Sequence, residues 1–182
     1  MKSLIKIILI VFAILLIGDI AASFYFYEIA IARNKKEFYK DNKDLQASIE
    51  VLDAVQEEDE DIDWAYEQVF EEVEIRSYDG LKLHAYYLET KTPTNRTAIL
   101  AHGYSSSAKA MGMYAKFYYE SLGYNILMPD ARGHGESEGD YIGLGWHDRK
   151  DYVQWVEYII NRVGPNSEIV LHGVSMGGAT VL

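Results

Sequence analysis

Residues 173–177 read Gly-Val-Ser-Met-Gly and directly follow the short apolar run of residues 168–171. A run of this kind is typical of a buried strand, and residues 178–182 can open a helix. Gly173 and Gly177 flank a point where the backbone must turn sharply, and a Cβ there would obstruct the close approach of strand and helix. The stretch therefore predicts a strand, a tight turn that carries Ser175, and a helix, with an ordinary glycine-rich turn as the simpler alternative.

The composition is that of a globular protein with one core. The chain has 182 residues, of which 49% are hydrophobic and 25% charged, and this length supports one sizeable core. Its formal net charge of −11 argues against nucleic acid as a partner. The absence of cysteine from the sequence excludes disulfides and thiolate metal sites, and we expect neither a metal nor a cofactor.

Residues 1–28 predict a transmembrane signal-anchor. Residues 7–27 are almost continuously apolar, and a helix of that length extends about 31 Å, which matches a hydrocarbon core of about 30 Å. Asp19 costs about 3 kcal/mol near the centre, less than the apolar side chains contribute. A cleaved signal peptide is the alternative. We expect a single-pass protein of the cell membrane with an extracytoplasmic main domain, although the basic residues after the span favour the opposite orientation.

Residues 29–68 are mostly polar, with apolar positions at helix-like spacing, and predict a helical, acidic stalk. Residues 57–63 are rich in carboxylates, but they lack the glycine turn and the alternating spacing of a calcium loop. A solvated linker is therefore the better interpretation.

Strands and helices alternate over residues 69–182. The runs 69–77 and 81–90 flank the turn pair Asp79-Gly80 and predict a hairpin. Further buried strands are expected at residues 97–101, 125–129 and 168–171. Apolar residues at helical spacing predict two helices, one that ends before Gly123 and one that ends before Gly164-Pro165. This order predicts an α/β fold in which helices cover both faces of a mostly parallel sheet.

Three motifs resemble those of the α/β-hydrolase superfamily, in particular its serine aminopeptidase-like and monoacylglycerol-lipase-like branch, which includes membrane-anchored bacterial hydrolases. They are Ala-His-Gly-Tyr at residues 101–104, Asp-Ala-Arg-Gly-His-Gly-Glu-Ser at 130–137, and Gly-Val-Ser-Met-Gly-Gly at 173–178. The resemblance covers residues 69–182. It implies an α/β-hydrolase fold in which the last motif is the nucleophile elbow.

The resemblance also implies roles for single residues. Ser175 looks like the nucleophile, and the main-chain N–H groups of Met176 and Tyr104 look like the oxyanion hole that stabilises the charge developing on the substrate carbonyl. The other motif residues look structural, and these are His102, Gly103, Asp130, Arg132, Gly133, His134, Gly135, Gly173 and Gly177. The implied substrate is a small-molecule or peptide ester, thioester or amide.

The triad acid and base of α/β-hydrolases follow the nucleophile along the chain, yet only residues 176–182 follow Ser175. A serine without a positioned imidazole is a poor nucleophile. We therefore expect the chain to be the N-terminal part of a serine hydrolase, truncated after the elbow and inactive by itself. The alternatives are a non-catalytic, membrane-tethered interaction domain and a serine activated by a histidine already present.

Overall fold

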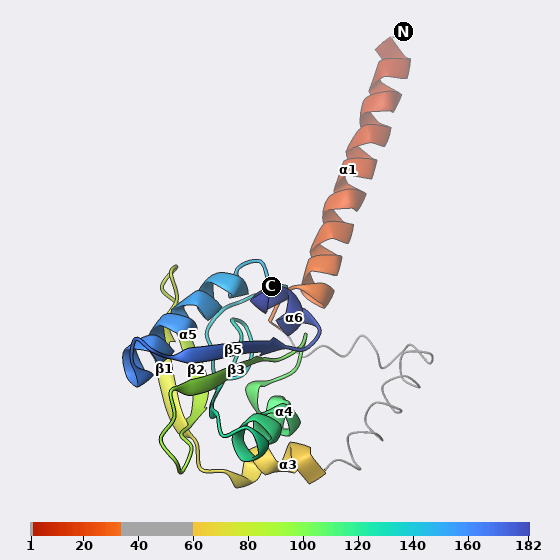
Figure 1. Ribbon diagram of the computed structural model, residues 1–182. Coiled ribbons are helices and arrows are strands. Elements are labelled where there is room, and N and C mark those ends of the chain that lie inside the picture. Colours follow the sequence, from red (N-terminus) through yellow and green to blue (C-terminus); the bar gives the residue numbers. More distant parts are fainter. Residues whose placement is uncertain (1, 34–59) are drawn as a thin grey trace.

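A five-stranded mixed sheet lies at the centre of the computed structural model, which describes residues 2–33 and 60–182 (Figure 1). Its strand order is β1-β2-β4-β3-β5. The strands are β1 (Glu71–Arg76), β2 (Lys82–Leu88), β3 (Arg96–Ala101), β4 (Asn125–Pro129) and β5 (Glu168–Gly173).

The pairing of the strands brings the three sequence motifs to one edge of the sheet. β2 is antiparallel to both β1 and β4, whereas β3 is parallel to β4 and to β5. The carboxyl ends of β3, β4 and β5 therefore point the same way, and each of the three motifs begins at one of these ends. In the register of β3 and β5, Ala101 lies opposite Gly173.

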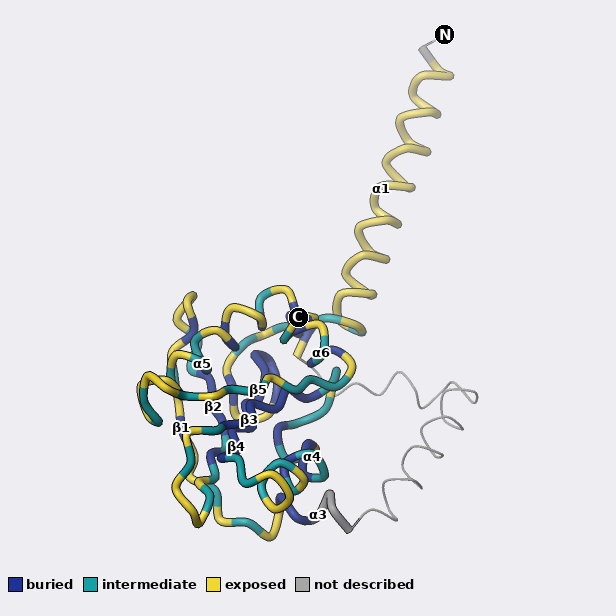
Figure 2. Tube along the Cα trace, in the orientation of Figure 1, coloured by how far each residue is buried: buried dark blue, intermediate teal, exposed yellow. Residues whose placement is uncertain are grey.

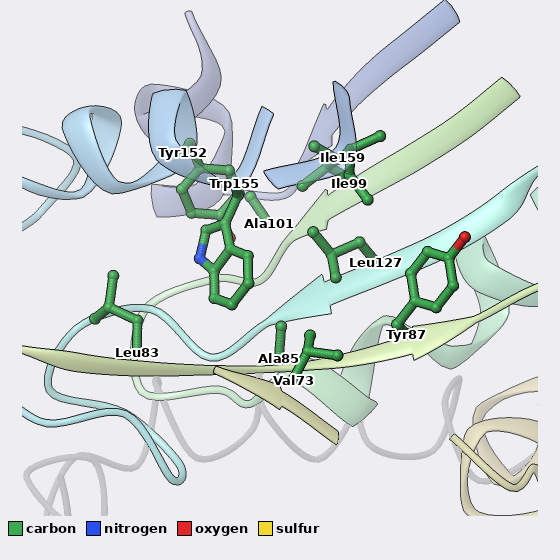
Figure 3. Packing of buried hydrophobic residues seen from close by; sticks show 10 residues of the cluster. All are labelled: Val73, Leu83, Ala85, Tyr87, Ile99, Ala101, Leu127, Tyr152, Trp155 and Ile159. Atoms are coloured by element: carbon green, nitrogen blue, oxygen red, sulfur yellow. The ribbon is translucent and has the colours of Figure 1, made fainter. Parts of the chain in front are cut away.

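Helices cover both faces of the sheet, as predicted. One face packs against α5 (Asp148–Val163), in a cluster that includes Ile99, Leu127 and Trp155. Figure 3 shows this cluster, with the Trp155 and Ile159 side chains of α5 directed at the strands. Because successive strand residues point to opposite faces, the neighbours Ala98, Leu100, Ile126 and Met128 belong to the cluster on the other face.

That second face is covered by a group of short helices. They are α3 (Glu60–Glu67), the 3₁₀ turn η1 (Ala108–Met111), α4 (Gly112–Lys116) and the π-helical turn η2 (Phe117–Ser121). A last helix, α6 (Met176–Val181), follows β5 and closes the described chain. The mostly parallel sheet between two helical layers confirms the predicted fold class (Figure 1).

The packed domain begins earlier than residue 69. α3 falls within the segment that we expected to be a stalk, yet Ala65 is fully buried and Trp64 donates a hydrogen bond from Nε1 to Oε1 of Glu120 at 2.9 Å. The sequence of α3 is short and acidic, so its hydrophobic pattern did not predict that one face of the helix is buried. Residues 34–59, which are most of the predicted stalk, lie outside the described residues, and with them Glu57, Glu58 and Asp59 of the carboxylate run.

The N-terminal helix α1 (Lys2–Ala30) extends away from the domain, and its residues are exposed along nearly its whole length (Figure 2). Ser3–Ala30 is long and apolar enough to cross a membrane, with a mean hydropathy of 2.8. A signal sequence has the same length and composition, so this property agrees with both interpretations of the N-terminus.

Trp155 on α5 provides a test of the packing. It is 1% exposed within the core, whereas Val153 on the same helix is 58% exposed. We expect Trp155→Ala to lower the free energy of unfolding by about 3–5 kcal/mol, because the cavity cannot refill, and Val153→Ala to change it by less than about 0.5 kcal/mol. Denaturant unfolding in detergent micelles, followed by far-UV circular dichroism, measures both. Equal losses would contradict the packing described for α5.

Candidate active site

Ser175 lies at the turn between β5 and α6 in a conformation that few residues adopt. Its φ is 53° and its ψ is −117°, and its side chain is exposed. A non-glycine residue held at positive φ costs about 1–3 kcal/mol and is a frequent feature of functional sites. The turn thus holds the Ser175 hydroxyl above the carboxyl edge of the sheet.

The glycines on either side of Ser175 allow this turn to form. A Cβ at Gly177 would collide with the carbonyl group of Ala101, and a Cβ at Gly173 would collide with the carbonyl of Gly177. The turn is further held by a 3.0 Å hydrogen bond from the Val174 N–H to the Ala101 carbonyl. Helix and strand therefore meet backbone to backbone, which only glycine permits here.

The loop after β3 lies beside Ser175. A Cβ built on Gly103 would be 3.5 Å from the Cβ of Ser175. Tyr104, the next residue, packs with Met176 in a small apolar cluster that also contains Ile142. Met176 is the first residue of α6. The first N–H groups of a helix have no acceptor within the helix, so the Met176 N–H is available to a ligand. The structure thus brings together Ser175 and both residues expected to form an oxyanion hole.

His102 is engaged in holding two loops together. It is 1% exposed, its Nδ1 lies 2.8 Å from the Gly103 carbonyl oxygen, and its Nε2 accepts a 3.0 Å hydrogen bond from the Ala131 N–H. The ring of His134 packs edge-on against it at 4.9 Å, with Nδ1 3.1 Å from the carbonyl oxygen of Arg132. Burial lowers the pKa of both rings, so both are neutral at pH 7.

Asp130 organises the loop that follows β4. Its buried carboxylate accepts hydrogen bonds from the N–H of Ala108 at 3.0 Å and of Glu136 at 3.2 Å, and lies 3.4 Å from Nδ1 of His84. A Cβ at Gly135, where φ is 46°, would strike that carboxylate. The loop can therefore close over Asp130 only with glycine at this position.

Arg132 forms a buried ion-pair network that the sequence did not reveal. Its Nε and Nη2 donate to the two carboxylate oxygens of Asp151 at 2.7 Å each, and Nη1 and Nη2 donate to Asp79 at 2.9 and 3.1 Å. Hydrogen bonding from Arg132 lowers the pKa of Asp79 to about 2. Asp151 is 2% exposed, so its ion pair with Arg132 is buried and does not lie on the surface of α5. The network ties the β1–β2 turn, the loop after β4 and α5 together.

The other histidines of the described chain also make contacts away from Ser175. His147 Nδ1 lies 2.6 Å from the Tyr78 hydroxyl, and His172 Nδ1 lies 3.2 Å from the Tyr118 hydroxyl. His147 occupies the N-cap position of α5 but makes no side-chain capping hydrogen bond there. Within the described residues no hydrogen bond joins a histidine ring to Ser175, and no group of three or more His, Asp or Glu residues there could hold a metal ion.

Comparisons with known proteins agree with this geometry. The sequence profile of the family described as serine aminopeptidase, S33, matches residues 92–182. The thiohydrolase aneE of Aspergillus aculeatus is 31% identical over 121 residues, which are 64% of this chain and 37% of that protein. The protein YqkD of Bacillus subtilis is 30% identical over 108 residues, which are 59% of this chain and 35% of that protein.

Among solved structures, the esterase Pf2001 of Pyrococcus furiosus is similar, with a TM-score of 0.54 and 30% sequence identity. The match covers 62% of this chain and 45% of the esterase. The chain thus spans a little more than a third of the two curated relatives and less than half of the esterase.

Adjacent glycines of α6 test the backbone contact at the elbow. We expect Gly177→Ala to lower the free energy of unfolding by about 3 kcal/mol, since its Cβ meets backbone that cannot move aside. At Gly178 the nearest atom to a new Cβ is the Gly173 carbonyl oxygen at 3.4 Å. Gly178→Ala should therefore leave the stability unchanged or raise it by up to about 1 kcal/mol. Denaturant titration measures the unfolding free energy of both variants. Similar changes in the two would contradict the close approach of Gly177 to the Ala101 carbonyl.

The buried imidazole of His102 predicts a pH dependence of stability. Because burial holds its pKa below the ordinary 6.5, the unfolded chain binds the proton more readily once the pH falls below that value. Stability should then be lost as the pH decreases, with no such loss above pH 6.5. His102→Asn removes this titration but keeps a donor and an acceptor. Between about pH 7.5 and 5.5 the variant should lose less unfolding free energy than the parent chain, and equal losses would contradict the assignment.

Proposed function

Because the chain belongs to the serine aminopeptidase S33 family of α/β-hydrolases, we propose that it carries the nucleophile of a serine hydrolase that acts through an acyl-enzyme on Ser175. The observation that carries this proposal is the positive φ of Ser175 at a strand-to-helix turn, beside Met176 and the loop that contains Tyr104. Strained residues of this kind cluster at active sites, which supports the functional interpretation over an inert glycine-rich turn.

In the proposed reaction the Ser175 Oγ attacks the substrate carbonyl carbon, and its proton passes to a general base. The negative charge that develops on the carbonyl oxygen is stabilised by the main-chain N–H groups of Met176 and Tyr104. Two fixed donors act without reorganisation, and one such donor contributes about 3–4 kcal/mol. The ester, thioester or amide bond then breaks as the leaving group takes the proton, and water releases the acyl group by the same path.

The acid and the base are proposed to come from residues beyond Leu182. The family order of serine, acid and histidine supports this, as does the 35–45% of its relatives that the chain spans. The engagement of His102 and His134 in loop contacts further argues against a base among the described residues. The similar proteins include a thiohydrolase and an esterase, which favours thioesters and esters as substrates.

We also propose that α1 anchors the protein in the cell membrane as a single span, with the main domain outside the cytoplasm. The support is the length and hydropathy of Ser3–Ala30 together with the signal-like start of the chain. A protease-protection assay on intact cells determines the side of the membrane.

Labelling by a fluorophosphonate, which reacts with activated serines, tests the chemistry. We expect the 182-residue chain to remain unlabelled and a longer chain that continues beyond Leu182 to be labelled at Ser175. Ser175→Ala should abolish that labelling. Ser107→Ala is the matched control, because Ser107 lies in the neighbouring loop and makes no side-chain capping hydrogen bond.

Two results would contradict the proposal. Labelling of the 182-residue chain at Ser175 would show that the described residues activate the serine by themselves. A longer product that is folded but unlabelled would favour the alternative of a non-catalytic, membrane-tethered interaction domain.

A further inference from the structure

The residues that follow α1 are not a free linker, because their backbone pairs with the loop after β4 through an isolated β-bridge. Ala32 is 7% exposed and forms an antiparallel bridge with Tyr141. On either side of this bridge the Ile142 N–H donates to the Ile31 carbonyl at 2.7 Å, and the Arg33 N–H donates to the Asp140 carbonyl at 2.8 Å. Paired backbone of this kind restricts how the domain can rotate relative to the span.

The Arg33 side chain strengthens this docking. Its guanidinium donates to the carbonyl oxygens of Ser137 at 2.6 Å, Gly135 at 2.7 Å and Gly139 at 3.4 Å. All three acceptors belong to the loop that Asp130 and Arg132 organise. A planar guanidinium with five N–H donors in a fixed arrangement suits such a set of carbonyls.

The docked segment also reaches the candidate site. The hydroxyl of Tyr104 donates a 2.7 Å hydrogen bond to the carbonyl oxygen of Ala30, and Tyr104 packs beside Met176. Ala30 follows Tyr27, where the apolar run ends, by three positions of helix, which is a rise of about 4.5 Å. The edge of the sheet that carries Ser175 therefore lies within about one helical turn of the end of the span. Figure 1 shows α6 beside the base of α1.

A second feature on the same side has the composition of a membrane-surface contact. Leu144 and Trp146 are 53% and 67% exposed, in the loop that continues from Tyr141. The guanidinium of Arg149 stacks 4.0 Å from the centre of the Trp146 ring. Tryptophan is enriched at membrane–water interfaces, and arginine beside it can pair with lipid phosphates.

We propose that the serine-bearing end of the domain lies on the membrane surface, held there by the docked segment Ala30–Arg33 and by insertion of Leu144 and Trp146 among the lipid headgroups. The occupant of this surface is the bilayer that α1 spans, because the docking fixes the loop beside the end of the span. If the proposed hydrolase function holds, substrates would enter from the bilayer. The substrate class is then an ester or thioester whose acyl chain partitions into lipid.

Tryptophan fluorescence of the full chain in phosphatidylcholine vesicles tests the contact. Trp146 is the exposed member of the three tryptophans, since Trp64 and Trp155 are 6% and 1% exposed. We expect lipids brominated near the headgroup to quench part of the emission, and Trp146→Phe to remove that quenched part. Quenching that is absent, or that persists in Trp146→Phe, would overturn the proposal.

A matched control moves the exposed tryptophan to the other end of the sheet. Leu122 is 40% exposed and precedes the amino end of β4. Leu122→Trp in the Trp146→Phe background should show no quenching by the brominated lipids. Equal quenching at this position would mean that the domain has no fixed orientation on the membrane.

A change at Arg33 tests the docked segment. Arg33→Ala should reduce the quenching of Trp146, because the domain can then turn away from the surface. Near-UV circular dichroism checks that the variant stays folded. Unchanged quenching in a folded variant would remove the docked segment from the proposal.

The substrate class is tested separately, on a longer chain that continues beyond Leu182, in vesicles. A short-chain, water-soluble thioester measures the proposed hydrolase function alone, and a long-chain thioester in the same vesicles measures entry from the bilayer. We expect kcat/KM to favour the long chain by about tenfold or more, from the higher local concentration, and Arg33→Ala to diminish this preference. Cleavage of both thioesters at equal rates would overturn the inference and leave the hydrolase function standing. Quenching of Trp146 without cleavage of either thioester would overturn the proposed hydrolase function and leave the membrane contact standing.

Discussion

Backbone meets backbone where α6 passes the end of β3, and a side chain at Gly177 would run into the Ala101 carbonyl. This close approach requires the chain to leave β5 and enter α6 within two residues, Val174 and Ser175, so Ser175 is forced to a φ of 53°. The pairing of β3 with β5 holds both sides of the contact in place. The strain at Ser175, about 1–3 kcal/mol, is thus imposed by the sheet, and the same packing sets Gly103 and Met176 around the serine.

The loops around this contact are held by buried polar groups rather than by apolar packing. Asp130, His102 and Arg132 each join segments that are distant in the sequence. Burying a guanidinium is costly unless its charge is paired and its donors are satisfied, and Asp79 and Asp151 meet both needs. Removing either carboxylate would leave Arg132 with buried donors unpaired, so the network makes one arrangement of these loops much more favourable than others. An active site with fixed geometry requires the loops around it to adopt one arrangement.

The sequence predicted those parts of the fold that depend on local pattern. The β1–β2 hairpin, the strands β3, β4 and β5, and the amphipathic helix α5 all lie where alternation, apolar runs and turn residues placed them. The residues that surround Ser175 were located through their motifs. Contacts that depend on topology could not be predicted in this way. Asp151 looks like an ordinary helix-surface acid in sequence, and only the packing of α5 against the loop after β4 buries it against Arg132.

The same reasoning explains why the docked segment was missed. Ala30–Arg33 is too short to have a periodicity, and its meaning comes from the loop that it pairs with, more than a hundred positions away. Arg33 looked like one of several basic residues after the span, where they bear on orientation in the membrane.

Electrostatics sets a limit on how the proposed membrane contact could arise. The net charge of −11 comes from residues after position 28, so long-range forces repel the domain from an anionic leaflet. A fixed orientation must therefore come from short-range interactions that act within a few ångströms. Hydrogen bonds from a charged guanidinium to carbonyl oxygens are of this kind, at about 1.5–3 kcal/mol each, and they are little affected by salt once they are partly buried. The docking of Arg33 could thus hold an acidic domain against a membrane without any electrostatic attraction to its lipids.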